Sequence, residues 1–489
     1  MILRPALLYF SALSLLTAAT WAAAPEDAPA DFAYFGNGMK IGEVSSDSAL
    51  IWTRLTEKPD RFIDGAPAPK KLSPEQRKNS GALIRKMEGS VPGRAGQVRL
   101  RYWPTEPPTG SEGPQNPTQT EWLPVNGEDD YTAHFTLNEL QAGTSYTVVL
   151  DAAGDSQGTQ IRSIKGSFRT APPASDNAGV RFGVVTCGDY PRRDHPDGHL
   201  IYPEMGRQNL DFFVHTGDII YYDKPYPIAD NIPLARFKWN RFYALPMQRE
   251  FHRQTPSYFL KDDHDTLDDD CWPGQTYGDL TFAQGLQLFK EQNPHAERPF
   301  RTYRWGQHLQ VWLMEGRDFR SPNRMPDGPE KTIWGPEQKE WLFKTVEESN
   351  ATFRVIISPT PIVGPDRKKK KDNHANSNFS FEGNQIRSFV SKQANTFIVC
   401  GDRHWQYASK DAETGVREFA CGPSSDSHAH GFKLEDRTDE HEYLQIIGGF
   451  LTVQVQPESE AGKDEKAQIS FRHHAVDGSV QNEMSFPAN

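Results

Sequence analysis

Four clusters of side chains that commonly bind metals follow apolar, strand-like segments in the C-terminal two-thirds of this 489-residue chain. In chain order they are Cys187, the segment 217–221 with Asp218 and Tyr221, the run 262–265, and the run 401–404. Because open α/β sheets bind their ligands outside the carboxyl ends of the strands, we expect the four clusters to converge. Each cluster alone is a weak signal, since Gly-Asp is a common turn dipeptide. Together, in this order, they predict one composite metal site.

The residue types indicate the chemistry of such a site. Two metal ions about 3.5–4 Å apart need a bridging carboxylate, and they activate a water for in-line attack on phosphorus. Asp218 is our candidate for the bridge. The chain contains no Gly-x-Ser-x-Gly elbow, no Walker-type phosphate loop and no His-Glu-x-x-His zinc helix. The sequence therefore favours a metal-dependent phosphoesterase that needs no protein nucleophile.

The elements that position these clusters are expected to form a layered α/β domain over residues 180–489. Its near-continuous apolar segments are typical of strands covered on both faces. They span residues 181–186, 211–215, 258–260, 309–314, 353–358 and 396–400. Residues 335–348 have Pro336 in the first turn and apolar residues at helical spacing, which predicts a crossover helix. Segments 443–447 and 451–455 are expected to form strands of a second sheet.

A smaller domain of the immunoglobulin or fibronectin type is expected over residues 33–172. Alternating apolar and polar residues predict strands at 49–54, 97–102, 132–136 and 146–150. The segment 140–146 resembles the corner of such sandwiches, where a tyrosine anchors a loop between strands. Residues 56–96, rich in Pro, Lys and Gly, fit an insertion between strands, and the linker 171–179 precedes the second domain.

Residues 1–24 have the three parts of a secretory signal peptide, with Arg4, an apolar run over residues 6–16, and small residues through Ala24. This pattern predicts a secreted or periplasmic protein. An uncleaved membrane anchor is the alternative, although a membrane span needs ~20 apolar residues.

Charge and cysteine content place further limits on function. Removing residues 1–24 takes away Arg4 and changes the formal net charge from −11 to −12. An acidic protein of this kind is not a general nucleic-acid binder, and no specific nucleic-acid or membrane partner is evident. Four cysteines are too few for a disulfide framework, although one pair is possible among Cys271, Cys400 and Cys421.

Taken together, the motifs resemble the calcineurin-like metallophosphoesterases and, more closely, the PhoD-like alkaline phosphatase and phosphodiesterase family. The resemblance rests on Ile-Trp-Thr-Arg at 51–54, Cys187, His-Thr-Gly-Asp-Ile-Ile-Tyr at 215–221, Asp-Asp-His-Asp at 262–265, Met-Glu-Gly-Arg-Asp-Phe-Arg at 314–320, the segment 335–342, and Gly-Asp-Arg-His at 401–404. It covers nearly the whole mature chain. It implies an immunoglobulin-like N-terminal domain and a metallophosphoesterase β-sandwich flanked by helices. The implied substrate is a phosphate-ester small molecule or a phosphodiester polymer.

The resemblance also implies a set of site residues. A ferric ion (Fe3+) would be held by Cys187, Asp218, Tyr221 and His404. Calcium (Ca2+) would be held by Asp218, Asp263 and Asp402. Thiolate and phenolate ligands suit ferric iron, whereas calcium prefers oxygen alone. His264 would act beside the metals as a proton donor to the leaving alkoxide or as an orienting group. Asp263 and Arg403 complete the implied catalytic set.

Two charged segments have more than one interpretation. The acidic run 268–270 either adds an oxygen ligand or forms a charged loop. The basic run 367–371 predicts a solvated loop. The alternative is a lid that carries cations for an anionic substrate, with His374 reaching the site.

Two other functions also fit parts of the pattern. The same metals can serve the hydrolysis of another anionic ester, such as a sulfate, because they recognise charge and geometry. A calcium-binding adhesion or carbohydrate-binding protein without enzymatic activity would use the N-terminal β-domain and would need no cysteine, tyrosine or histidine ligands.

Overall fold

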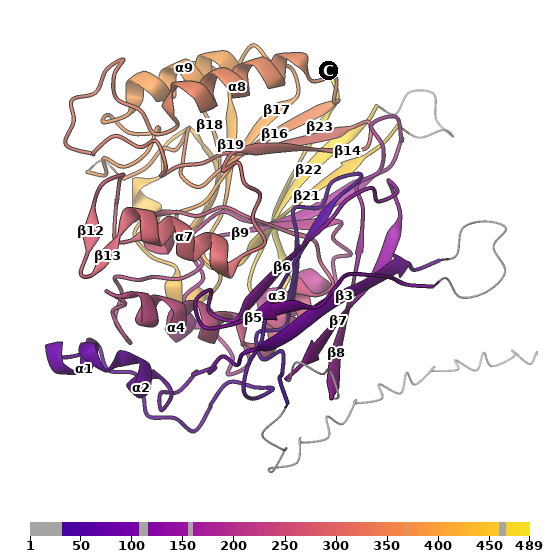
Figure 1. Ribbon diagram of the computed structural model, residues 1–489. Coiled ribbons are helices and arrows are strands. Elements are labelled where there is room, and N and C mark those ends of the chain that lie inside the picture. The colour runs from indigo at the N-terminus through magenta and orange to yellow at the C-terminus, as the bar shows by residue number, and fades with distance from the viewer. Residues whose placement is uncertain (1–31, 107–115, 155–159, 368, 459–465) are drawn as a thin grey trace, which may run out of the picture.

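The computed structural model describes residues 32–106, 116–154, 160–367, 369–458 and 466–489 (Figure 1). The predicted signal peptide, residues 1–24, lies outside these described residues. None of the described helices combines the length and the apolar character that a membrane span requires.

Two β-sheets packed face to face form the centre of the C-terminal region. A nine-stranded sheet has the order β23-β22-β21-β9-β10-β11-β1-β2-β6, and a seven-stranded sheet has the order β14-β15-β16-β17-β19-β18-β20. One hydrophobic cluster holds side chains of both sheets, among them Phe182 and Phe212 of the first and Val355 and Phe419 of the second. The apolar runs of the sequence are therefore buried between the two sheets.

The nine-stranded sheet combines segments from both ends of the chain. Its strands are β1 (Met39–Gly42), β2 (Ala49–Arg54), β6 (Thr132–Leu137), β9 (Val180–Val185), β10 (Phe212–His215), β11 (Ser257–Phe259), β21 (Phe450–Gln456), β22 (Gln468–His474) and β23 (Val480–Pro487). The strands β9, β10 and β11 are parallel, so their carboxyl ends lie at one edge of the sheet.

The seven-stranded sheet has a parallel centre formed by β15, β16, β17 and β19. Its strands are β14 (Arg301–Trp305), β15 (Leu309–Leu313), β16 (Phe353–Ser358), β17 (Thr396–Cys400), β18 (Gln406–Lys410), β19 (Arg417–Cys421) and β20 (His441–Gln445). The strands predicted at 353–358 and 396–400 are confirmed as β16 and β17.

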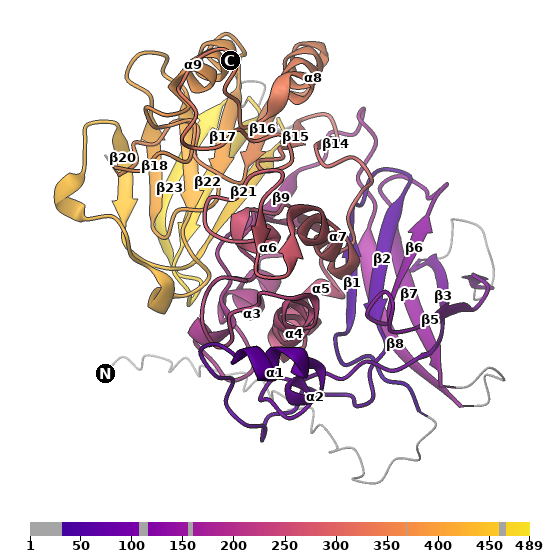
Figure 2. The ribbon, with the colours of Figure 1, turned by 60° about the vertical axis from the view of Figure 1, so that its left-hand side comes forward.

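Helices cover the outer faces of this sandwich (Figures 1 and 2). The seven-stranded sheet is covered by α8 (Gly335–Glu348), which confirms the predicted crossover helix, and by α9 (Ser380–Val390). The nine-stranded sheet is covered by α3 (Ile201–Gly206) and α5 (Pro246–His252). The other elements of this region are α4 (Ile232–Tyr243), α6 (Asp263–Thr266), α7 (Phe282–Gln292), β12 (Thr276–Tyr277) and β13 (Leu280–Thr281).

The prediction that segments 443–447 and 451–455 share a second sheet is wrong. The strand β21 pairs antiparallel with β9 in the nine-stranded sheet, whereas β20 pairs with β18 in the seven-stranded sheet. Both segments have the apolar pattern of buried strands, and that pattern fits either sheet. The choice of sheet depends on pairing between strands far apart in the chain.

The N-terminal region forms a second β-sandwich. A five-stranded sheet consists of β3 (Gly96–Pro104), β4 (Thr118–Gln119), β5 (Leu123–Val125), β7 (Ser145–Ala153) and β8 (Ile161–Arg169). It packs against β1, β2 and β6 through a shared core. The Tyr146 hydroxyl accepts a hydrogen bond from the Gln141 backbone N–H at 2.9 Å, which confirms the predicted tyrosine corner. The expected α/β fold class with an N-terminal β-sandwich is confirmed.

Strand pairing links the two predicted domains. The first strand, β1, pairs in parallel with β11, so the nine-stranded sheet continues from one region into the other. The predicted division, with residues 33–172 before the linker and 180–489 after it, stays a prediction.

The insertion at residues 56–96 contacts the C-terminal region as well as its own sandwich. It contains the short helices α1 (Pro74–Lys78) and α2 (Ser80–Ile84), which lie beside α4 in Figure 2. Leu72 and Met87 of the insertion are buried in one cluster with Ile219 and Tyr222 of the segment that follows β10. The insertion therefore supports a loop that carries candidate site residues.

The Trp-Thr-Arg segment of β2 connects the N-terminal sandwich to helices α4 and α7 of the C-terminal region. The Trp52 indole donates to the Glu291 carbonyl at 2.8 Å, and the Arg54 guanidinium contacts the Asp130 carboxylate at 2.9 Å. Asp130 also accepts hydrogen bonds from Asn240 on α4 at 2.8 Å and from Gln292 on α7 at 2.9 Å. This buried network fixes the two regions relative to each other.

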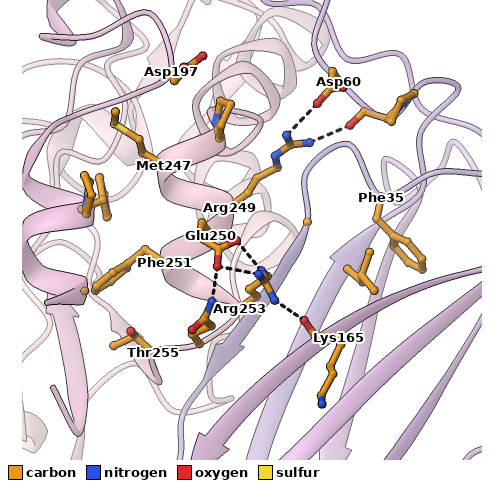
Figure 3. A pocket seen from close by; sticks show the side chains of 18 of the residues that line it. Phe35, Asp60, Lys165, Asp197, Met247, Arg249, Glu250, Phe251, Arg253 and Thr255 are labelled. Carbon is orange, nitrogen blue, oxygen red and sulfur yellow. Dashed lines mark hydrogen bonds and ion pairs between the residues drawn. The ribbon is translucent and has the colours of Figure 1, made fainter. Parts of the chain in front are cut away.

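A cleft of about 1260 Å3 lies between β8 and the helices α3 and α5 (Figure 3). Arg249 of α5 and Arg253, which directly follows α5, project into it, where Arg249 pairs with Asp60 and Arg253 with Glu250. None of the four clusters of predicted metal ligands lines this cleft. It belongs to the junction of the two regions and not to the predicted site.

Replacing Arg54 by alanine tests the junction network. The change leaves Asp130 buried without its cation, so we expect the free energy of unfolding to fall by about 3–5 kcal/mol. Urea titration followed by tryptophan fluorescence measures the loss. The control is Arg207→Ala, because this exposed arginine pairs with Glu204 at the surface and should matter by less than about 1 kcal/mol. Equal losses in the two variants would contradict the assigned role of Arg54.

Candidate metal centre

The predicted site residues lie in the loops at the carboxyl ends of β9, β10, β11 and β17. Cys187, Asp218 and Asp402 all have positive φ values, of 55°, 55° and 62°. Such backbone conformations are strained for residues with a side chain, and they persist where the surrounding structure over-determines them. The three loops therefore hold their donor side chains in fixed positions.

Close packing between these loops explains the two glycines that precede the aspartates. Gly217 has φ +105°, and a Cβ there would lie 2.7 Å from the Asp262 Cβ. At Gly401 a Cβ would lie 2.5 Å from the Thr216 hydroxyl oxygen and 2.9 Å from the Thr186 hydroxyl oxygen. Any side chain at either position would push the neighbouring loop away. The Gly-Asp dipeptides thus bring Asp218 and Asp402 close to the other strand ends.

Cys187, Asp218, Tyr221 and His404 are brought together. The Cys187 Sγ lies 3.6 Å from Asp218 Oδ2, and the Tyr221 hydroxyl lies 3.3 Å from the same oxygen. The Tyr221 hydroxyl is also 3.4 Å from His404 Nε2. These four side chains converge on one point.

Asp218 also takes part in two further donor groups. One contains Asp263 and His264, and the other contains Asp262 and Asp402, and in each group one donor atom of every residue lies within 4.8 Å of the others. Asp262 was not among the predicted ligands, although it lies in the predicted run 262–265. Asp218 therefore occupies the centre of the predicted cluster.

The buried carboxylates of this cluster carry negative charge that bound cations would neutralise. Asp218 Oδ1 and Asp262 Oδ2 are buried and have no hydrogen-bond partner among the described residues. Burial, followed by repulsion from Asp263 and Asp262, raises the pKa of Asp218 well above its ordinary value. A buried carboxylate oxygen without a partner is costly, and a coordinated metal ion removes that cost. The donor types present (thiol, phenol, imidazole and carboxylate) also suit a transition metal beside a hard cation.

Arg317 is a residue of the site that the sequence did not single out. Its Nε lies 2.5 Å from Asp262 Oδ1, and its Nη2 lies 3.5 Å from Asp263 Oδ2. Burial acts to raise the pKa of Asp263, but Arg317 and His264 hold it well below its usual range. The sequence signal that could have identified Arg317 is the arginine-containing segment 314–320, which lies at the end of a predicted strand.

Arg403, a predicted catalytic residue, is buried and pairs with three carboxylates. It lies 3.2 Å from Asp366 and 3.2 Å from Asp372, and it also pairs with Asp402. Arg403 thus ties the loop 366–372 to the end of β17. Its catalytic role stays a prediction.

His264 lies in α6 beside the donor groups and is oriented by a carboxylate. Its Nδ1 is 2.7 Å from Asp223 Oδ1, and its ring lies 4.5 Å from that of Tyr221. Burial alone would lower the pKa of His264, but the neighbouring carboxylates of Asp263 and Asp223 raise it above its ordinary value. The ring is therefore suited to hold a proton. Asp223 was not predicted as a site residue.

The acidic run 268–270 folds back toward the site without joining the donor groups found among the described residues. The Asp270 backbone N–H donates to Asp263 Oδ2 at 2.7 Å. Burial and the nearby Asp372 raise the pKa of Asp270 to about 6. The run thus positions Asp263 through its backbone.

The alternative in which His374 reaches the site is wrong. His374 is fully buried, its Nε2 lies 2.9 Å from Glu382 Oε2, and its ring packs against Trp334. In the basic run, Lys370 pairs with Asp372 at 2.8 Å. This part of the loop is held by ion pairs with its own acidic neighbours.

All four cysteines are buried and free, so the structure contains no disulfide among Cys271, Cys400 and Cys421. His428 and His430 were not among the predicted site residues. Together with His404 they form a fourth donor group within 4.8 Å. Their spacing of two residues in a loop after β19 was the only signal in the sequence.

Comparisons with known proteins agree with this geometry. A family model described as PhoD-like phosphatase matches residues 182–447. A solved structure of PhoD is 15% identical, covers 95% of this chain and 92% of its own, and superposes with a TM-score of 0.71. The purple acid phosphatase PPD1 from yellow lupin (Lupinus luteus) seeds is 12% identical, covers 92% of this chain and 74% of its own, and has a TM-score of 0.61. No curated protein sequence matches this chain.

Asp218→Asn tests the central position of this carboxylate. The change removes one negative charge that three donor groups share, so we expect loss of bound metal and of most activity, with the fold retained. Elemental analysis, an activity assay and circular dichroism measure the three effects. Asp279→Asn at an exposed turn is the matched control. Full activity with unchanged metal content in Asp218→Asn would identify Asp218 as an ordinary turn residue.

Proposed function

The chain belongs to the PhoD-like phosphatase family and is a phosphoric ester hydrolase, and we propose that it hydrolyses phosphate monoesters or diesters at the Asp218 centre. The observation that carries the proposal is that one buried carboxylate, Asp218, is common to three donor groups from four strand ends. A bridging carboxylate of this kind is what a pair of catalytic metal ions requires.

The proposed ligands follow the donor types. Ferric iron would be held by Cys187, Asp218, Tyr221 and His404, and calcium would be held by Asp218, Asp263 and Asp402. Asp262 lies in one donor group with Asp218 and Asp402 and offers a further oxygen ligand. When bound, such ions lower the pKa of a water and neutralise charge on the phosphoryl oxygens.

The residues of the chain that surround this centre have separate tasks. His264 holds a proton for the leaving oxygen, and Asp223 fixes its ring by the 2.7 Å contact at Nδ1. Arg317 contacts the Asp262 and Asp263 carboxylates and holds them in place. Arg403 acts as a positioning residue, since its contacts connect the loop 366–372 with Asp402.

Membership in a phosphatase family favours phosphate esters over sulfate esters, and it disfavours the non-enzymatic calcium-binding alternative. The apolar segment at residues 6–16 supports a secreted or periplasmic location as part of the proposal.

The proposed activity is tested with three chromogenic esters. p-Nitrophenyl phosphate, bis-p-nitrophenyl phosphate and p-nitrophenyl sulfate are assayed before metal removal, after it, and after iron and calcium are restored. We expect hydrolysis of at least one phosphate ester that is lost with the metals and returns with them. Faster hydrolysis of the sulfate, or phosphate hydrolysis that survives complete metal removal, would reject the proposal.

Tyr221→Phe tests the iron assignment by colour. Burial and Asp218 raise the pKa of Tyr221 well above its ordinary value, so only a strongly acidic cation would ionise it in this position. A phenolate on ferric iron gives a charge-transfer band, and we expect a violet to pink wild type whose band disappears in Tyr221→Phe. Absorption spectra and iron analysis measure this. A colourless wild type with stoichiometric iron would reject the phenolate.

His264→Asn tests the proton donor by comparing leaving groups. An alkoxide needs a proton to leave, whereas nitrophenolate leaves readily without one. We therefore expect kcat to fall by about 10^2–10^4-fold for an alkyl phosphate and by much less for p-nitrophenyl phosphate. If both substrates lose the same factor, His264 only orients other groups.

A further inference from the structure

We propose that His404, His428 and His430 form an additional site for a divalent transition metal such as Zn2+, next to the Asp218 centre. The three residues come from two loops, one after β17 and one after β19. One ring nitrogen of each lies within 4.8 Å of the other two. Neither the phosphatase activity nor the proposed iron and calcium ligands account for His428 and His430.

The distances between the rings suit tetrahedral coordination. His404 Nδ1 lies 3.3 Å from His430 Nε2. Zinc binds imidazole nitrogen at about 2.0–2.1 Å with tetrahedral geometry, which places two ligand nitrogens about 3.3–3.4 Å apart. The ring centroids of His404 and His428 are 4.2 Å apart. The His404 and His430 nitrogens are therefore spaced as ligands of one ion, and a ring nitrogen of His428 lies within 4.8 Å of both.

Hydrogen bonds to the backbone fix the His428 ring and join the two loops. His428 Nδ1 lies 3.1 Å from the Cys187 carbonyl oxygen, so it carries the proton and leaves Nε2 as a free donor atom. Metal-binding histidines commonly have such a contact to a carbonyl on their second nitrogen. The His430 backbone N–H donates to the His404 carbonyl at 3.1 Å and joins the two loops.

His404 takes part in both centres through different nitrogens. Its Nε2 faces the Tyr221 hydroxyl at 3.4 Å, whereas its Nδ1 faces His430. The new site therefore lies directly beside the Asp218 centre. It would bring a further positive charge to the place where an anionic substrate binds.

Arg192 competes with a metal ion for this position. Its Nη1 lies 3.2 Å from His430 Nε2, the same nitrogen that faces His404. Arg192 also contacts Asp189 at 3.5 Å, and its side chain is 39% exposed. It can therefore turn toward Asp189 and solvent when an ion binds.

The donor set selects the class of ion. Three imidazoles suit zinc, copper and nickel, whereas calcium requires oxygen ligands. Because His430 is exposed, the fourth coordination position faces solvent. Structural zinc sites are closed by four protein ligands, and this one is open.

Zinc titration of the purified holoenzyme, which keeps its native metals, tests the proposal. We expect calorimetry to show one additional equivalent of bound zinc, and elemental analysis after desalting to show that iron and calcium stay bound. His430→Asn should weaken zinc binding by more than about a hundredfold. Arg192→Gln should strengthen it by about tenfold, because a competing cation is removed. His195→Asn, at an exposed histidine paired with Asp197, is the matched control and should bind zinc as the wild type does.

Absence of an additional zinc equivalent in the wild type would overturn the proposal, as would equal zinc affinity of the wild type and His430→Asn. Zinc binding is measured without any substrate. An active phosphatase that binds no extra zinc rejects only this site, and an inactive protein that binds it rejects only the proposed hydrolysis.

Discussion

Buried negative charge at one edge of the sheet sandwich is the constraint on which the rest of the site depends. Asp218, Asp262, Asp263 and Asp265 are all nearly excluded from solvent. Arg317 pairs with Asp262 and Asp263, whereas no ion pair reaches Asp218 or Asp265 among the described residues, so the cluster holds more buried carboxylates than paired cations. Cations at the unpaired oxygens of Asp218 and Asp262 would restore the balance, and this requirement connects the fold to metal-dependent chemistry.

The surrounding structure serves to hold these charges in place. Cys187, Asp218 and Asp402 all have strained backbone, and tight loop packing at Gly217 and Gly401 supports the two aspartates. Farther out, the Arg54–Asp130 network joins the N-terminal sandwich to α4 and α7, and the insertion at 56–96 packs below the loop that carries Asp218. Parts of the chain distant in sequence thus contribute to one rigid site.

The sequence predicted the parts of the fold that depend on local pattern. Apolar runs located β16 and β17, and helical spacing located α8. The sheet that β21 joins was not predictable, because strand pairing over hundreds of residues leaves no local pattern.

The same reason applies to the site. Asp218 and His404 follow strands and were found, whereas the pairing of Arg317 with Asp262 and the place of His428 beside Cys187 depend on how loops meet. The alternative that placed His374 at the site was wrong. A position next to a basic run in the sequence does not indicate that the side chain is buried against Glu382.

Anomalous X-ray diffraction from crystals of the native enzyme is the most direct test of whether Asp218 bridges two metal ions, as we propose. Data collected on both sides of the iron absorption edge should place iron beside Cys187 and Tyr221. A second metal peak should lie about 3.5–4 Å from the iron, with one Asp218 carboxylate between the two. A single ion at this edge of the sandwich, or two ions that do not share Asp218, would contradict the account.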